Sequence, residues 1–191
     1  MCNVGLASLA FFYCDSREGQ KKERRGLLTS LLTQLCGQSD AYCAILSDLY
    51  STKGKGLHHV SDGELRRHLL RILQLPGQAP AYIVIDGLDE CPVTGGLPSP
   101  REGALHIVEE LVDLQLPNLR ICVTSRPEVD IDSVLRPLAL YSVSLHDQSG
   151  QIQDIAEYVK HVVSTDRNAR RWTKENKELV IQVLTEKSGG M

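Results

Sequence analysis

The chain has no apolar run of about 18 residues, the minimum that a membrane-spanning helix requires. It has no strong charge of one sign either, because 21 Lys and Arg stand against 24 Asp and Glu and give a net charge of −3. Nucleic acid and membranes are therefore not expected partners. The N-terminal residues lack the basic region and the cleavage site of a signal peptide. With 191 residues, 42% of them hydrophobic, the chain suits one α/β domain with its own core.

The cysteines form no Cys-x-x-Cys pair, which argues against a zinc site and against a disulfide framework. They lie among apolar neighbours, as reduced thiols do, so we expect a reducing, cytoplasmic environment. Their positions are Cys2, Cys14, Cys36, Cys43, Cys91 and Cys122. The sequence also has no nucleophile elbow, no Ser/His/Asp arrangement and no dinucleotide-binding glycine fingerprint. An unrelated hydrolase or transferase therefore has no motif to support it.

The most informative segment is Ala81–Glu90, an apolar run that ends in Asp-Gly-Leu-Asp-Glu. Its apolar part, rich in β-branched residues, is typical of a strand buried on both faces of a parallel sheet. The carboxylates of Asp86, Asp89 and Glu90 then crowd the C-terminal end of this strand. A Mg²⁺ ion carrying nucleotide phosphates would offset their charge, because a hard cation prefers oxygen ligands. The segment is a candidate Walker B strand, and the alternative is a strand that ends in a solvated acidic turn.

A second apolar strand follows in the segment Asn118–Pro127 and ends in Thr-Ser-Arg-Pro. By itself this ending is also an ordinary turn in which Pro127 stops the strand. Arg126 nevertheless carries a permanent charge and forked donors, which suit the terminal phosphate of a nucleotide. Two strands with polar tips at this spacing, with a helical stretch between them, indicate a nucleotide site more strongly than either one does.

Together these segments resemble the NACHT subgroup of the STAND class of P-loop NTPases. Ser8–Ser16, followed by an amphipathic helix, is similar to the region just after the P-loop in fungal nephrocystin-like NACHT proteins. The resemblance covers nearly the whole chain. It implies a part of an ATP-dependent switch in signal transduction, whose parent protein carries an effector region before the module and repeats after it.

The resemblance also implies roles for the polar residues at the ends of the two strands. Asp86 would hold the Mg²⁺ of Mg-ATP, only when nucleotide is present, and Asp89 or Glu90 would polarise the attacking water. The sensor 1 group at the γ-phosphate would consist of Thr124, Ser125 and Arg126.

One part of the family's pattern is missing, because the P-loop, Gly-x-x-x-x-Gly-Lys-Ser/Thr, occurs nowhere in the sequence. The pair Gly54-Lys55 has no first glycine at the right distance and no Ser or Thr after the lysine, so we interpret it as a basic loop. A P-loop supplies several charge-assisted hydrogen bonds of roughly 1.5–3 kcal/mol each. Losing about 6 kcal/mol weakens binding by about four decades. We therefore expect this chain alone to bind Mg-ATP no more tightly than roughly millimolar, and not to hydrolyse it.

Strands and helices alternate along the chain, which predicts a parallel sheet with helices on its faces. With the resemblance, this implies an α/β fold: a three-layer, P-loop NTPase-like parallel sheet flanked by helices, without the P-loop strand and with the start of a C-terminal helical lid. Capping boxes at Ser61–Glu64 and Ser99–Glu102 mark two helix starts. The expected strands are residues 7–14, 81–86, 119–124 and 140–145. If the resemblance holds, the C-terminal ends of strands 81–86 and 119–124 lie side by side, and Asp86 faces the same cleft as Thr124 to Arg126. The first expected helix follows the strand at 7–14 and ends near residue 36. The others cover residues 40–50, 61–75, 99–115, 128–135, 151–163 and 174–187, and a Gly/Lys-rich loop is expected at 51–59.

We divide the chain into a partial NACHT nucleotide-binding core, residues 1–146, and the beginning of the lid region, residues 147–191. The missing P-loop and the short lid suggest a fragment, a truncated gene model or a decayed paralogue of a NACHT NTPase. The alternative function is a non-enzymatic interaction module that associates with other NACHT chains. We also expect self-association, because an isolated strand at 140–145 would leave an apolar sheet edge unpaired.

Overall fold

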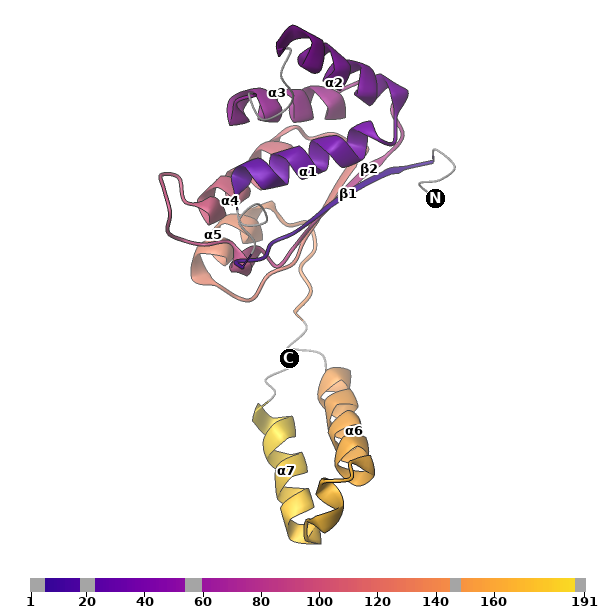
Figure 1. Cartoon of the computed structure of the whole chain (residues 1–191), viewed down its shortest axis with the longest axis vertical. Coiled ribbons are helices and arrows are strands. Elements are labelled where there is room, and N and C mark those ends of the chain that lie inside the picture. Colours follow the sequence, from indigo (N-terminus) through magenta and orange to yellow (C-terminus); the bar gives the residue numbers. More distant parts are fainter. Residues whose placement is uncertain (1–5, 18–22, 54–59, 145–148, 188–191) are drawn as a thin grey trace. The chain divides into compact units, whose positions relative to one another are not determined.

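The computed structural model describes residues 6–17, 23–53, 60–144 and 149–187. The chain divides into two compact units, Met1–Ala139 and Leu140–Met191, and the sheet belongs to the first of them (Figure 1).

The first unit is built on an open sheet of three parallel strands in the order β1-β2-β3. The strands are β1 (Ser8–Tyr13), β2 (Ala81–Asp86) and β3 (Leu119–Val123). Tyr13 pairs with Asp86, and Ile85 pairs with Val123, so the C-terminal ends of all three strands lie at one edge of the sheet. The expected α/β fold is confirmed, and so is the prediction that the second and third strands are parallel neighbours.

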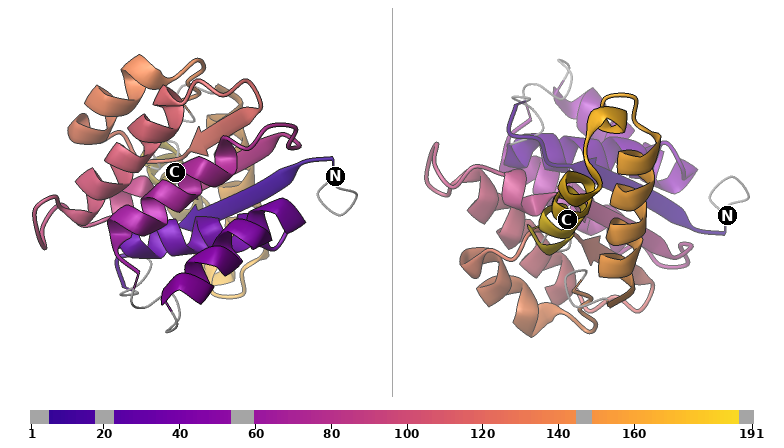
Figure 2. Two further views of the ribbon diagram at one scale, coloured as in Figure 1. Left: turned by 90° about the horizontal axis from the view of Figure 1, so that it is seen from above. Right: turned by 90° about the horizontal axis from the view of Figure 1, so that it is seen from below.

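Helices follow each strand of this unit and pack on one another as well as on the sheet. They are α1 (Arg24–Cys36), α2 (Asp40–Lys53), α3 (Asp62–Leu73), α4 (Pro100–Asp113) and α5 (Val129–Leu138), with a 3₁₀ turn η4 (Leu88–Glu90) directly after β2. Figure 2 shows α1, α3 and α4 lying across the same face of the sheet. On that face the side chains of Ala10, Ile83 and Ile85 are fully buried, in the same core cluster as the leucines of α1. Burying each such leucine contributes roughly 1.5–3 kcal/mol.

Both predicted capping boxes are confirmed. At the start of α3, Ser61 Oγ accepts a hydrogen bond from the backbone N–H of Glu64, whose carboxylate accepts the N–H of Ser61 at 3.0 Å. The same exchange joins Ser99 and Glu102 at the start of α4, where Pro100 occupies the first turn. Each box satisfies backbone donors that a helix start leaves without intrahelical partners.

The outer edge of β1 is covered by two glutamine side chains, Gln34 in the last turns of α1 and Gln38 just after this helix. Leu9 donates its N–H to the Gln38 carboxamide at 2.9 Å and accepts a hydrogen bond from it at 2.6 Å. Phe11 makes the same pair of hydrogen bonds with Gln34, at 3.0 and 2.7 Å. The carboxamides thus stand in for a neighbouring strand and satisfy an edge that would otherwise be free to pair with another chain.

The second strand differs from the strand buried on both faces that its composition indicated. Tyr82 is 45% exposed, because α1, α3 and α4 pack on the opposite face of the sheet. Phe11 and Tyr13 on β1 share its exposed face, and their ring centroids are 5.4 Å apart. An apolar strand sequence therefore does not require two helical layers.

The predicted strand at residues 140–145 is wrong for the described residues 140–144, which have no strand conformation. Leu140, Tyr141 and Val143 are 91%, 92% and 73% exposed. Alternating apolar residues form a strand only where a neighbour supplies backbone partners, and none pairs with 140–144 in the described residues. The predicted loop at 51–59 is also corrected, since residues 51–53 belong to α2; its remainder and residue 145 lie outside the described residues.

The second unit consists of two helices, α6 (Ser149–Thr165) and α7 (Lys174–Lys187), joined by a turn that contains the 3₁₀ turn η5 (Ala169–Arg171). Both helices were predicted. Val163 and Ala169 are buried, whereas α7 contributes no buried residue. In the part of the chain that the structure describes, no helix is both long enough and apolar enough to cross a membrane.

Candidate functional site

The ends of β2 and β3 are tied together by backbone hydrogen bonds that continue beyond the strands. Thr124, the first residue after β3, donates its N–H to the Ile85 carbonyl at 2.9 Å. Its own carbonyl accepts the N–H of Leu88 at 3.0 Å. The acidic turn η4 is therefore held against the end of β3, where parallel α/β sheets place their ligands.

The hydroxyl of Thr124 connects two residues of the acidic segment. It donates to Asp86 Oδ1 and accepts the N–H of Gly87 at 3.0 Å. Gly87 has φ of +68°, a left-handed conformation that glycine adopts without strain, and it turns the chain from β2 into η4. Asp86 and Thr124 thus lie in direct contact, as the sequence predicted for the tips of two neighbouring strands.

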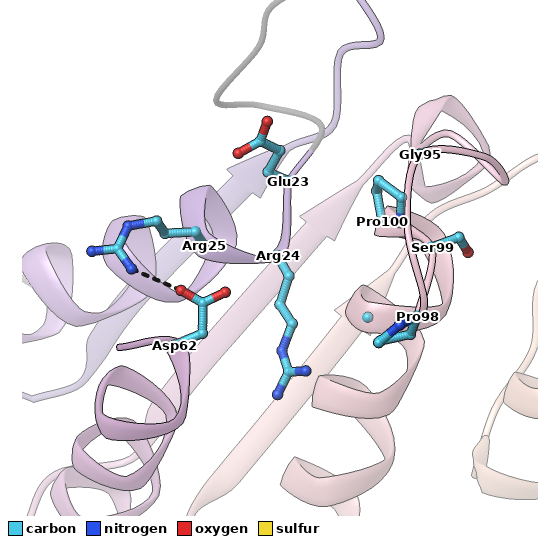
Figure 3. A pocket seen from close by; sticks show the side chains of 9 residues that line it. Glu23, Arg24, Arg25, Asp62, Gly95, Pro98, Ser99 and Pro100 are labelled. Carbon is cyan, nitrogen blue, oxygen red and sulfur yellow. Dashed lines mark hydrogen bonds and ion pairs between the residues drawn. The ribbon is translucent and has the colours of Figure 1, made fainter. Parts of the chain in front are cut away.

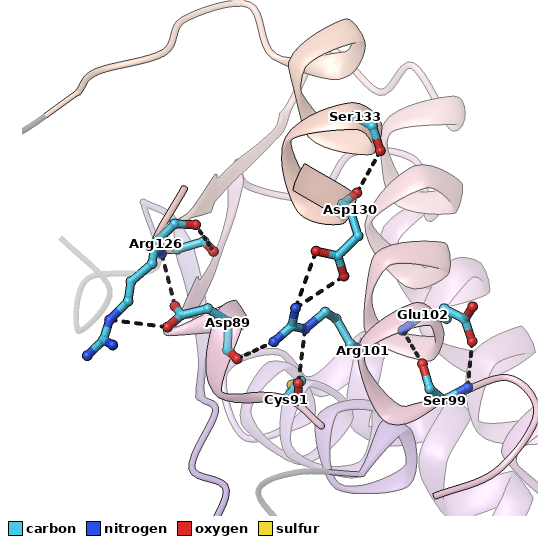
Figure 4. Close-up of polar contacts among 9 residues, drawn as sticks. Asp89, Cys91, Ser99, Arg101, Glu102, Arg126, Asp130 and Ser133 are labelled. Carbon is cyan, nitrogen blue, oxygen red and sulfur yellow. Dashed lines mark hydrogen bonds and ion pairs between the residues drawn. The ribbon is translucent and has the colours of Figure 1, made fainter. Parts of the chain in front are cut away.

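Asp89 and Arg126 form a second contact across the same edge (Figure 4). Arg126 donates its N–H to Asp89 Oδ1 at 3.0 Å, and its Nε lies 3.5 Å from Asp89 Oδ2. The side chain of Arg126 is 74% exposed, so this ion pair contributes little stability. The backbone N–H of Glu90 donates to the Gly87 carbonyl at 2.9 Å, whereas its side chain is exposed and makes no hydrogen bond or ion pair among the described residues. The hydroxyl of Ser125 donates to the Arg126 carbonyl at 2.8 Å.

Arg101 supports the acidic turn from behind, and sequence reasoning missed it. Its guanidinium donates to the carbonyls of Asp89 and Cys91, the latter at 3.0 Å, and pairs with Asp130 on α5 at 3.1 Å (Figure 4). Arg101 is 9% exposed, so these contacts are made largely out of water. The only sequence signal was an arginine in the first turn of the helix that follows the acidic segment.

Two buried thiols lie next to this turn. Cys14, just after β1, and Cys91, just after η4, have their Sγ atoms 3.1 Å apart. The hydrogen bond between them raises the pKa of the Cys14 thiol and lowers the pKa of the Cys91 thiol. Burial opposes the lowering at Cys91, and the positive charge of Arg101 adds to it. The five cysteines within the described residues are all free thiols.

Asp86 suits a magnesium ion, but it is a small part of a complete site. Mg²⁺ is usually bound through one or two carboxylates together with waters and substrate phosphates. No group of three or more His, Cys, Asp or Glu side chains is arranged to hold a metal ion within the described residues. The 191 residues also contain no P-loop to hold the phosphates. Asp86 therefore fits Mg²⁺ only where a nucleotide brings the remaining ligands.

A pocket of about 210 Å³ lies between the start of α1 and the loop before α4 (Figure 3). Its lining residues are separate from the acidic edge, which is the C-terminal end of β2 with Asp86, Asp89 and Glu90. Arg25 and Asp62 form an ion pair of 2.8 Å in its wall, and Arg24 contributes a buried Nε atom without a hydrogen-bond partner. None of the predicted site residues lines it. No sequence pattern indicates this pocket, because loops and helix starts from three separate segments form it.

A known protein family matches the part of the chain that carries this sheet edge. The family described as Nephrocystin 3, N-terminal, matches residues 3–126. The chain belongs to this family. The match begins before β1 and ends at Arg126, so all the predicted site residues lie within the part that the Nephrocystin 3 N-terminal family shares. No curated protein and no solved structure matches the chain.

Proposed function

We propose that this chain is part of a NACHT-type nucleotide switch of the STAND class, resembling those of fungi. It would be the part that carries the Walker B carboxylates and the sensor 1 residues. One observation carries the proposal: Asp86 and Thr124 meet at the carboxyl ends of two parallel strands. Side chains at this edge of an open α/β sheet are where nucleotide ligands bind. In a protein that also carries a P-loop, Asp86 would bind the Mg²⁺ of Mg-ATP, which supplies charge neutralisation at the phosphates.

The contacts of the other predicted site residues suggest a different role for each of them. Thr124 orients the Asp86 carboxylate, since its hydroxyl is already donated to that group. The Asp89 carboxylate is engaged by Arg126, whereas the Glu90 side chain is exposed and makes no hydrogen bond or ion pair among the described residues. Glu90 is therefore the better candidate to polarise an attacking water. Arg126, held by Asp89 only at 3.5 Å through its side chain, is free to exchange this carboxylate for a γ-phosphate.

The proposal is tested by supplying the P-loop. The chain alone is expected to bind Mg-ATP no more tightly than roughly millimolar in isothermal titration, because several phosphate contacts are missing. Joining the P-loop strand and loop of another family member in front of Met1 should strengthen binding about 100-fold or more, in a magnesium-dependent manner.

The variant that decides the test is Asp86→Asn in the joined protein. It should abolish the magnesium-dependent part of the gain, whereas the matched control Asp113→Asn, an exposed carboxylate at the end of α4, should keep it. Equal binding by Asp86→Asn and the parent would refute a metal role for the acidic edge. Micromolar binding by the unextended chain would refute the claim that the P-loop is needed.

A second candidate function is a non-enzymatic module that associates with other chains of the family. The observation that favours it is the exposed apolar face of the sheet, which includes Leu9, Phe11, Tyr13 and Tyr82 at 37–55% exposure. Contiguous apolar surface of this kind is typical of interaction sites. Sedimentation velocity separates the two functions: Phe11→Glu should abolish association if this face is used, while leaving nucleotide binding by the joined protein unchanged.

A further inference from the structure

Cys14 and Cys91 are brought together by the fold from positions 77 residues apart, with their Sγ atoms at 3.1 Å. Both backbones are held in place: Cys14 donates its N–H to the Asp86 carbonyl at 2.9 Å, and Cys91 donates to the Leu88 carbonyl at 3.1 Å. Both residues are buried, at 6% and 2% exposure. A disulfide bond has an S–S length of about 2.0 Å, so the two sulfur atoms need to approach by only about 1 Å.

We propose that Cys14 and Cys91 form an oxidation site, at which a small peroxide converts the thiol pair into an intramolecular disulfide. The inference rests on the placement of the two thiols and does not depend on the nucleotide proposal. No motif in the sequence marks the pair, because the two residues are far apart along the chain.

The chemistry balances with hydrogen peroxide as the oxidant. Cys91 reacts first, because a positive charge nearby favours the reactive thiolate form. That charge is the Arg101 guanidinium, whose Nε donates to the Cys91 carbonyl (Figure 4). The Cys91 sulfur attacks one peroxide oxygen, the O–O bond breaks, and a sulfenic acid and water form. The Cys14 thiol then attacks the Cys91 sulfur and displaces the hydroxyl group as a second water. Two thiols lose two electrons in total, and one peroxide is reduced to two waters.

The surroundings of Cys91 select a small oxidant. Cys91 is itself buried, but the chain becomes exposed at residues 93–98, directly after it. A local opening of this loop admits hydrogen peroxide, whereas a bulky disulfide such as oxidised glutathione needs a larger opening. The other described thiols differ: Cys43 and Cys122 are exposed, and the Cys36 sulfur lies 3.4 Å from the Tyr42 carbonyl oxygen.

The bond would have a direct consequence for the acidic edge. It would join the end of β1 to the residue that follows η4, the turn that carries Asp89 and Glu90. Oxidation would thereby restrict the movement of this turn relative to the sheet. Reduction would restore it, so the site would respond reversibly to peroxide.

The test uses the full, reduced chain treated with hydrogen peroxide, blocked with an alkylating agent and mapped by mass spectrometry without reduction. The expected product is a Cys14–Cys91 linked peptide pair, lighter by two hydrogens than the two peptides and separated again by dithiothreitol. Cys91→Ser should lose this product, whereas the matched control Cys36→Ser, which also removes a buried thiol, should retain it.

The wild-type map decides the question even if a cysteine variant fails to fold. Recovery of Cys14 and Cys91 as unlinked alkylated peptides, under conditions that oxidise the exposed Cys43 and Cys122, would overturn the proposal. Linkage of either residue to any other cysteine in place of the Cys14–Cys91 pair would overturn it as well.

Discussion

Gly87 lets the chain turn from β2 into the acidic turn, and its backbone conformation disfavours any residue that has a Cβ atom. At its φ of +68°, a Cβ atom costs roughly 1–2 kcal/mol. Gly87→Ala should therefore lower the free energy of unfolding by about 1–2 kcal/mol, measured by urea denaturation. The added atom itself makes only an ordinary contact, 3.6 Å from the Cys14 carbonyl oxygen. The matched control Gly63→Ala, whose Cβ meets nothing within 4 Å in α3, should be neutral or stabilising, and equal losses in both would contradict the argument.

Cys36 should make the stability of the chain depend on alkaline pH. Burial, with a smaller contribution from Cys43, raises the pKa of the Cys36 thiol from 9.0 to about 11. Between these values the unfolded chain has lost this proton while the folded chain keeps it, so stability falls as the pH rises. The fall begins near pH 9 and this contribution is complete above about pH 11.

The measurement is the urea midpoint as a function of pH for the wild type and for Cys36→Ala. The variant should show a shallower fall between these pH values, whatever its stability at neutral pH. Cys122→Ala, which removes an exposed thiol, is the control and should follow the wild type. A slope that is the same in all three proteins would rule out Cys36 as a source of the pH dependence.

At the scale of single residues, the sequence was enough to predict site residues that are neighbours along the chain. Asp86, Asp89 and Glu90 stand together at the end of an apolar run, and a parallel sheet brings Thr124 to the same edge. Arg101 could not be found in this way. It reaches the carbonyls behind the acidic turn only because α4 packs there, and no local pattern encodes that contact.

Among the elements, the first strand shows how a helix and the residues just after it cover a sheet edge. If the carboxamides of Gln34 and Gln38 replace a neighbouring strand, removing both should expose four backbone groups of β1. The variant Gln34→Ala/Gln38→Ala should lose about 0.5–1.5 kcal/mol per hydrogen bond at most, since water can take over. Its main effect should be concentration-dependent association through strand pairing.

Sedimentation velocity over a range of concentrations measures this effect. Gln74→Ala, a change at the exposed end of α3, is the control and should sediment as the wild type does. If the double variant stays as monodisperse as this control, the glutamines are not what keeps the edge from pairing.

Elements with local signals were predicted well, and those that need a distant partner were not. The starts of α3 and α4 are encoded in four residues each, as capping boxes. A strand, in contrast, needs a neighbour, and residues 140–144 have the alternation of a strand without one in the described part of the chain. Tyr82 is a similar case, because its exposure depends on which face the helices cover and not on its own segment.

At the scale of the whole molecule, the two units differ in how much they bury. The first unit surrounds a continuous core in which Leu28, Leu31, Ile83 and Ile85 are fully buried. In the described part of the second unit only Val163 and Ala169 are buried. Stability within a protein follows such local burial, so the two units should open with different free energies.

Amide hydrogen exchange followed by mass spectrometry tests this difference. Amides of α6 and α7 should exchange well before those of β1 and β2, under conditions in which the first unit remains folded. The amides of α2 are an internal control, because α2 is a helix of the first unit. They should exchange more slowly than those of α6 and α7, which would show that fast exchange does not follow from helical structure alone. If α6 and α7 were protected as strongly as β2, they would have to unfold together with the sheet, and the chain would behave as one cooperative domain.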